Sequence, residues 1–166
     1  KNMKTLIIKL LLVSSTLFIS CGSSETKVEK PVNKVKPETE KVWEEFTIEA
    51  IGNTMMDMQY SLKNISVNAG SWVRINLINK GVDPAMIHNI LIVNYNKRSE
   101  VATAAIEAGP ELDYIPKNKD VIAGSKQANP GETVTLEFKA PSKGNYEFFC
   151  SYPGHSSKMR GYFFVK

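Results

Sequence analysis

The stretch from Cys150 to Met159 reads Cys-Ser-Tyr-Pro-Gly-His-Ser-Ser-Lys-Met, which places three potential metal donors on one short segment. Four residues separate Cys150 from His155, and three separate His155 from Met159. One apolar run ends at Phe149 and another starts at Gly161, so the segment is predicted to be a loop between two strands. The chain has one further histidine, His88, just before the apolar run 90–93.

A thiolate, two imidazoles and a thioether form a soft donor set, and His₂Cys with a weak axial Met is the ligand set of blue-copper electron-transfer sites. Each residue alone has a plainer interpretation, because a lone His or Met is usually core packing and a buried Cys behaves as a small hydrophobe. Zinc is an alternative metal, although structural zinc sites use Cys₄ or Cys₂His₂ without a thioether. The combination on one loop favours copper.

Alternating apolar and polar residues predict strands in the rest of the domain. The apolar run 90–93 lacks this alternation and is expected to be a central strand. The predicted strands include 46–50, 73–77, 90–93, 134–138, 146–150 and 162–165. Short strands separated by Gly and Asn turns predict an all-β fold, a Greek-key β-sandwich.

One segment has helical spacing instead. Ser99 is predicted to cap a helix from Glu100 to Ala108, which Gly109 and Pro110 would end. A single short helix in a long crossover between strands is compatible with a Greek-key sandwich.

The N-terminal residues 1–20 are basic at the start and then apolar, which is typical of a signal peptide. Residues 17–22 resemble a bacterial lipobox, so Cys21 is predicted to carry the lipid anchor. The alternatives are an ordinary cleaved signal with an incidental cysteine, and a disulfide between Cys21 and Cys150 that would compete with lipidation. Residues 21–41 are polar, without an aromatic residue, and are interpreted as a flexible tether.

The net charge of +4 comes from the N-terminal part of the chain. Residues 42–166, the predicted globular domain, contain 13 basic and 13 acidic residues. A surface that follows phosphates needs an excess of Lys and Arg, so nucleic-acid binding is excluded.

Residues 42–166 resemble a cupredoxin, and within that group an azurin. The resemblance rests on three segments: Met86 to Asn89, Phe148 to His155 followed by Met159-Arg160-Gly161, and Met58-Gln59-Tyr60. It implies a copper ion, Cu(I)/Cu(II), held by His88, Cys150 and His155.

The same resemblance implies further roles around the copper. Met159 is the axial ligand, and the carbonyl of Ile87 is a weak additional donor. Asn89 and Ser151 would tie the ligand loop to the strand of the first histidine. An apolar electron-transfer patch would comprise Met58, Ala85, Met86, Tyr152, Pro153 and Gly154, with Lys158 at its edge.

The expected function is single-electron transfer between redox partners at a membrane surface, with His155 as the exit. The partners would be cytochromes or a copper or haem oxidase or reductase, and the location the bacterial cell envelope, periplasmic or surface-facing. An enzyme is not expected, because a second copper centre needs histidines that this chain lacks. A periplasmic copper carrier or buffer is the alternative, since Met55, Met56 and Met58 could bind Cu(I).

Overall fold

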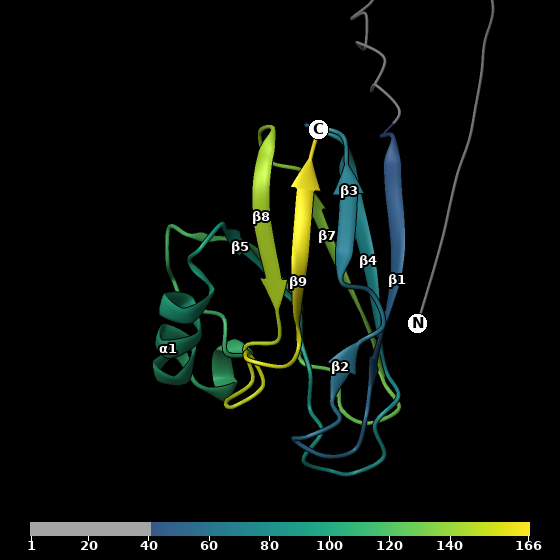
Figure 1. Ribbon diagram of the computed structural model, residues 1–166, viewed down its shortest axis with the longest axis vertical. Coiled ribbons are helices and arrows are strands. Elements are labelled where there is room, and N and C mark those ends of the chain that lie inside the picture. Colours follow the sequence, from purple (N-terminus) through teal and green to yellow (C-terminus); the bar gives the residue numbers. More distant parts are fainter. Residues whose placement is uncertain (1–40) are drawn as a thin grey trace, which may run out of the picture. The chain divides into compact units, whose positions relative to one another are not determined.

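The computed structural model describes residues 41–166, which fold into nine strands and one α-helix (Figure 1). A short 3-10 turn at Pro110–Leu112 follows the helix. The strands are β1 (Trp43–Ile51), β2 (Gln59–Tyr60), β3 (Asn64–Val67), β4 (Trp72–Asn79), β5 (Leu91–Asn94), β6 (Val121–Gly124), β7 (Thr133–Lys139), β8 (Gly144–Phe149) and β9 (Arg160–Val165). The helix α1 spans Arg98–Ala108. No helix in this part of the chain is both long and apolar enough to cross a membrane.

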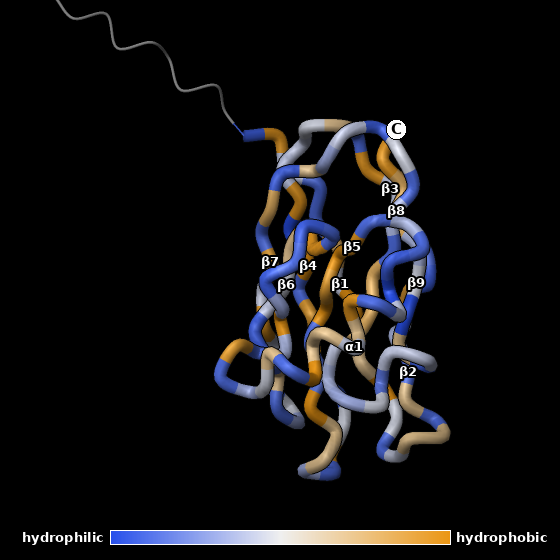
Figure 2. Tube along the Cα trace, turned by 90° about the vertical axis from the view of Figure 1, so that its left-hand side faces the viewer, coloured by the Kyte–Doolittle hydropathy of each residue, from blue (hydrophilic) through white to orange (hydrophobic). Residues whose placement is uncertain are grey.

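The strands form two sheets, which confirms the predicted β-sandwich. One has four strands in the order β2-β1-β4-β7, and the other has five in the order β3-β9-β8-β5-β6. The pairs β1–β4 and β3–β9 are parallel, whereas the other neighbours are antiparallel. Apolar stretches of the strands run through the middle of the domain in Figure 2.

The four-stranded sheet has one buried face and one exposed face. In β4, Val73, Ile75 and Leu77 are buried, and the residues between them are only partly covered. Strand β7 alternates in the same way around Leu136 and Phe138. This is the pattern expected of an antiparallel or mixed sheet with solvent on one side.

Strands β5 and β8 of the five-stranded sheet are buried on both faces over most of their length, whereas their neighbour β9 has an exposed outer face. In β5, Leu91, Ile92 and Val93 have no exposed surface, as predicted for a central strand. The outer face of β5 and β8 is covered by α1, whose Val101 packs with Leu91, Val93 and Phe149 in a separate apolar cluster. The helix therefore shields from solvent the strands β5 and β8, which lead to the metal centre.

The predicted helix is present, but its start was wrong. Lys97 is the N-cap residue, without a side-chain capping bond, and Ser99 lies inside the first turn. Gly109 ends the helix with a φ of 73°, which confirms the predicted stop. The helix lies in the connection between β5 and β6, which are neighbours in one sheet, so this connection does not cross to the other sheet.

Three strands were missed in the sequence. Strand β2 has only two residues, β3 alternates over four, and β6 is a run of four partly covered residues. Segments this short carry too little periodicity to be distinguished from loops.

Candidate metal centre

Strand pairing brings the two separate parts of the site together. Cys150 follows the last residue of β8, and β8 pairs with β5 through Phe149 and Leu91. His88 lies three residues before Leu91 and forms two backbone hydrogen bonds with Ala128, of 3.1 and 2.7 Å. His88 and Cys150 are thus fixed by backbone hydrogen bonds at the same end of the sheet.

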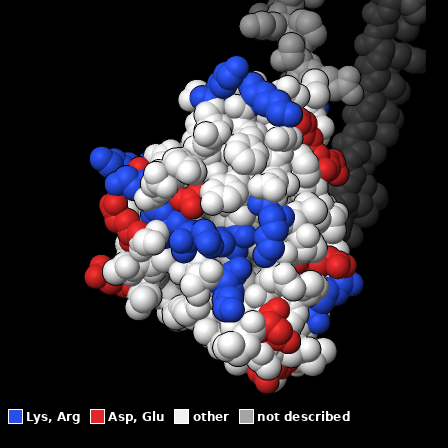
Figure 3. Space-filling view, viewed as in Figure 1, with Lys and Arg blue, Asp and Glu red and all other residues white. Residues whose placement is uncertain are grey.

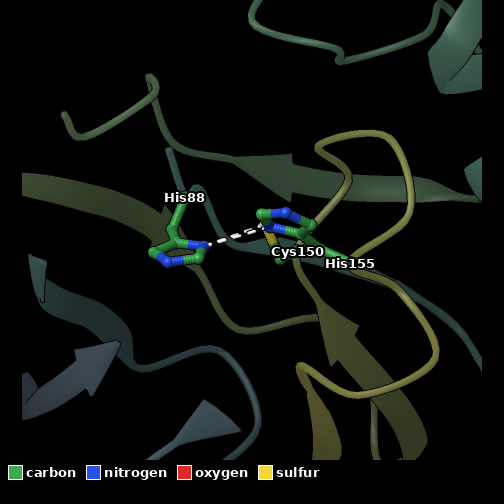
Figure 4. Close-up of side chains that lie close together, drawn as sticks. All are labelled: His88, Cys150 and His155. Atoms are coloured by element: carbon green, nitrogen blue, oxygen red, sulfur yellow. Dashed lines mark hydrogen bonds between the residues drawn. The ribbon is translucent and has the colours of Figure 1, made fainter. Parts of the chain in front are cut away.

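The three strong donors converge on one point (Figure 4). Nδ1 of His155 lies 3.2 Å from Nδ1 of His88. Sγ of Cys150 lies 3.9 Å from Nδ1 of His88 and 3.8 Å from Nδ1 of His155. A circle through the three atoms has a radius of about 2.1 Å, close to the ~2.0–2.3 Å of metal–nitrogen and metal–sulfur bonds. The residues present therefore fit a metal ion in a trigonal plane.

The ligand loop closes the β8–β9 hairpin. Phe149 pairs with Arg160, and the N–H of Cys150 donates to the carbonyl of Met159 at 3.0 Å. The N–H of Met159 in turn donates to the carbonyl of His155 at 2.9 Å, and Met159 is fully buried. Gly154, at the tip, has a φ of 85°, a conformation that favours glycine. These bonds hold the loop backbone independently of any metal.

Asn89 and Ser151 tie the two parts of the site together, as predicted. The N–H of Ser151 donates to Oδ1 of Asn89 at 2.8 Å, and Nδ2 of Asn89 donates to Oγ of Ser151 at 2.8 Å. The hydroxyl of Ser151 donates to the carbonyl of Tyr114 at 2.8 Å, and Nδ2 of Asn89 also reaches the carbonyl of Asp113 at 2.7 Å. Asp113 and Tyr114 both have positive φ, and no sequence pattern indicated their role.

Burial keeps the donors neutral in the metal-free protein. Desolvation lowers the pKa of His155 to about 4, and desolvation together with the charge of His155 lowers that of His88 to about 4. Burial raises the pKa of the Cys150 thiol to about 11, although the N–H groups of Asn89 and Tyr152 and the hydroxyl of Tyr60 act in the opposite direction. Neutral imidazoles are ready to bind a metal, whereas the thiol must release its proton.

Part of the predicted apolar patch was wrong. Met58 and Met86 are only 2% and 4% exposed and belong to the hydrophobic core, so they cannot contact a partner. Ala85, Gly154 and Lys158 are exposed, and Tyr152 and Pro153 are half-buried, as a contact surface requires. The two methionines were misplaced because the sequence does not show which residues of a loop turn inward.

The exposed apolar residues near the loop tip come from neighbouring positions instead. Met56 and Val82 are 78% and 76% exposed, and Met55 is 47% exposed. The methyl group of Met55 packs over Gly154, and the N–H of Val82 donates to Oδ1 of Asn53 at 2.8 Å, which joins the two loops. In the sequence, the adjacent Met55 and Met56 had suggested Cu(I) binding. In the structure they are part of the exposed apolar surface near the loop tip.

Arg98, at the start of α1, contacts the ligand loop, and the sequence did not indicate this contact. Its Nη1 donates to the carbonyl of Ser156 at 2.9 Å, and its Nε lies 3.8 Å from Oε1 of the buried Glu147. It connects the helix to the residue after His155. The carbonyl of Ile87 stays a prediction, and Cys21 lies outside the described residues.

Comparisons with known proteins agree with this geometry. Residues 47–166 match the family model described as copper binding proteins, plastocyanin/azurin family. Auracyanin-A from Chloroflexus aurantiacus is 35% identical over 118 residues, which cover 69% of this chain and 71% of auracyanin-A. Azurin from Alcaligenes faecalis is 37% identical over 111 residues, covering 63% of this chain and 87% of that azurin.

The solved structure of auracyanin A, described as a "blue" copper protein, superposes with a TM-score of 0.67 at 30% identity. It covers 75% of this chain and 99% of the auracyanin chain. The converging His, Cys and His donors, the sandwich and these matches agree on one conclusion. This chain belongs to the plastocyanin/azurin family of copper-binding proteins.

Proposed function

We propose that this blue-copper electron-transfer protein carries single electrons between redox partners at a membrane surface, with a copper ion held by His88, Cys150 and His155. The observation that carries the proposal is the convergence of three buried donor atoms within 3.9 Å of one another. Met159 would add its thioether, and Ile87 its backbone carbonyl, as weaker donors. Bound copper cycles between Cu(I) and Cu(II), which supplies the one-electron chemistry.

The protein's own contribution is a fixed donor geometry. His88 is held by its backbone bonds to Ala128, and the ligand loop by its bond from Cys150 to Met159. Phe148 is fully buried in the same core cluster as Cys150, which keeps water away from the sulfur. Little rearrangement is then needed when the metal changes oxidation state, and the surroundings of the Cys sulfur tune the potential.

Electrons leave through His155 in this proposal. His155 is 1% exposed, but its neighbour Gly154 is exposed, and its ring lies 4.8 Å from that of the half-buried Tyr152. The exposed Met55, Met56 and Val82 lie on loops at this end of the domain and, with Ala85, Pro153 and Gly154, offer partners an apolar contact surface. Cytochromes or a copper or haem oxidase or reductase are the proposed partners.

We further propose that the protein is not an enzyme and is held in the bacterial cell envelope by a lipid on Cys21, with residues 22–41 as the tether. The chain contains two histidines, so a second copper centre of the oxidase type cannot be built beside this one. The anchor is tested by Cys21→Ser, which should move the protein from the membrane fraction to the soluble fraction. Equal partition of both forms would contradict it.

The visible absorption spectrum tests the proposed function. The copper-loaded protein should have an intense blue band from charge transfer between the Cys150 sulfur and Cu(II), and Cys150→Ser should abolish it. Met159→Leu is the matched change, expected to keep the band and raise the reduction potential, since loss of a weak donor disfavours Cu(II). A colourless protein that holds only Cu(I) would point to a copper carrier or buffer, an alternative that the exposed Met55 and Met56 favour.

A further inference from the structure

A hollow of about 400 Å³ lies beside the ligand loop and is lined by three cationic side chains, Lys63, Lys158 and Arg160. We call it the basic hollow. Asn64, Ser157 and Tyr162 add polar side chains to its lining. Figure 3 shows Lys and Arg side chains gathered across the middle of this face of the domain.

The fold brings the three cations together from separate parts of the chain. Lys63 immediately precedes β3, Arg160 begins β9, and these two strands are parallel neighbours with Asn64 paired to Tyr162. The N–H of Tyr162 donates to the carbonyl of Lys63 at 2.8 Å. An added Cβ at Gly161 would lie 2.5 Å from that carbonyl, so the glycine permits this close approach.

The three cations of the basic hollow line one site and have no counter-ion among the described residues, a property that they share with exposed lysines elsewhere, such as Lys139 and Lys143. Within residues 41–166, Lys63, Lys158 and Arg160 form no ion pair within 4.0 Å, whereas Arg74 pairs with two glutamates and Lys97 pairs with Glu100. Partial burial and the charge of Arg160 lower the pKa of Lys63, which indicates repulsion between the two cations. An incoming anion would relieve this repulsion.

The basic hollow is connected to the copper site through the ligand loop. Ser157 and Lys158 lie between His155 and Met159, and the N–H of Lys158 donates to the carbonyl of His155 at 3.1 Å. A second groove, lined by Tyr152, Pro153 and Gly154, shares Ser157 and Arg160 with the basic hollow. An anion bound in the hollow therefore touches the loop that carries His155.

We propose that the basic hollow binds clustered carboxylates on an acidic redox partner and docks that protein beside the ligand loop. The inference rests on the proposed electron-transfer function and names the class of partner. A protein is favoured over an anionic membrane because the site is concave, contains three cations rather than the four to eight of typical lipid-binding clusters, and belongs to a domain with 13 basic and 13 acidic residues. Charge complementarity of this kind sets orientation and association rate.

The test uses the full-length copper-loaded protein and poly-L-glutamate as the carboxylate probe at low ionic strength. The variant Lys63→Glu/Lys158→Glu/Arg160→Glu should bind the polymer at least about tenfold more weakly than wild type. The neutral variant Lys63→Gln/Lys158→Gln/Arg160→Gln should bind the polymer with an affinity between those of wild type and the charge-reversed variant. It still tests the proposal if the charge reversal disturbs folding. The matched control is Lys139→Glu/Lys143→Glu/Lys166→Glu, three exposed lysines with the same change of charge. These lie at or near the ends of β7 and β9 and the start of β8, the end of the sandwich away from the ligand loop.

A second readout is the rate at which hexacyanoferrate(III) oxidises the reduced protein. Poly-L-glutamate should slow this reaction for wild type and the distal control, and leave the hollow variants unaffected. Equal polymer binding by wild type and both hollow variants, or equal weakening by the distal control, would overturn the proposal. Binding to phosphatidylglycerol vesicles is measured in a Cys21→Ser background. If the vesicles bound through the three residues and the polymer did not, the proposal would also be overturned. The blue band is recorded separately, so a colourless protein rejects the electron-transfer function whatever the polymer data show.

Discussion

The two sheets of the sandwich have similar core faces and very different outer faces. The outer face of the four-stranded sheet is exposed to solvent, and there Arg74 bridges Glu45 and Glu137 at 2.5 and 2.7 Å. On the five-stranded sheet, α1 covers the corresponding face of β5 and β8, and even a charged residue of β8, Glu147, is buried there beside Arg98. The same face of β9 stays exposed. All four predicted side-chain ligands lie at the ends of strands in the covered sheet or on the loop that joins them.

This difference shows how one fold combines a surface that tolerates substitutions with a site that does not. A polar group on the exposed sheet exchanges its partner for water at little cost, whereas a buried one that loses its partner retains the full desolvation penalty. The covered sheet therefore fixes the donors in place without help from the metal. Changes of the same chemical kind should therefore have unequal effects in the two sheets.

The largest effect is expected from protonating the buried histidines of the metal-free protein. Their pKa of about 4 is below the ordinary value of 6.5, so the unfolded chain binds more protons between these pH values. The free energy of unfolding should therefore fall as the pH drops from 6.5 to 4, at up to about 1.4 kcal/mol per pH unit for each histidine. This stability is fully present above pH 6.5 and is lost as the pH approaches 4.

Urea unfolding of the metal-free protein at several pH values measures this loss. The control is His88→Gln/His155→Gln, which keeps the carboxylates that also titrate in this range but has no histidine at the site. The wild-type curve should fall more steeply than that of the control. Parallel curves would mean that the imidazoles are not held neutral by burial, and would remove this distinction between the two sheets.

A smaller effect is expected from Ser151→Ala in the covered sheet. The change removes the hydroxyl between Asn89 and Tyr114 and leaves the Tyr114 carbonyl without this donor. A loss of about 1–3 kcal/mol in the free energy of unfolding is expected, because the groups left behind are largely shielded from water. Urea unfolding measures the loss, and a shift of the reduction potential should accompany it, since Ser151 follows Cys150 directly. Ser151→Thr keeps the hydroxyl and should restore both values; an unchanged potential in Ser151→Ala would limit Ser151 to a structural role.

The sequence predicted the site better than the surface around it, for a physical reason. His88, Cys150 and His155 are rare residue types, and their chemistry and spacing indicate that they meet, whatever the details of packing. The exposure of Met58 and Met86 depends on which neighbours cover them, and nothing local distinguishes them from the exposed Met55 and Met56.

The same reasoning applies to the elements of the fold. Strands such as β4 and β7 were predictable because alternation over seven or eight residues is a strong signal. The contact from Arg98 to Ser156 joins residues 58 positions apart and exists only because α1 docks beside the ligand loop. The basic hollow likewise depends on the pairing of β3 with β9, and β3 was not recognised in the sequence. Contacts of this kind follow from topology, which local patterns do not encode.

The smallest effect is expected from Thr135→Ala, the counterpart of Ser151→Ala in the exposed sheet. Both hydroxyls contact the side chain of an asparagine, and the hydroxyl of Thr135 donates to Oδ1 of Asn76 at 2.8 Å across β7 and β4. Because this pair is exposed, water can replace the lost bond, and cross-strand pairs of this kind contribute only about 0.2–1 kcal/mol. Urea unfolding of the two alanine variants side by side gives the comparison directly, and the reduction potential of Thr135→Ala should equal that of wild type. If Thr135→Ala cost as much stability as Ser151→Ala, burial would not be what separates the two sheets, and the rigidity of the copper site would need another source.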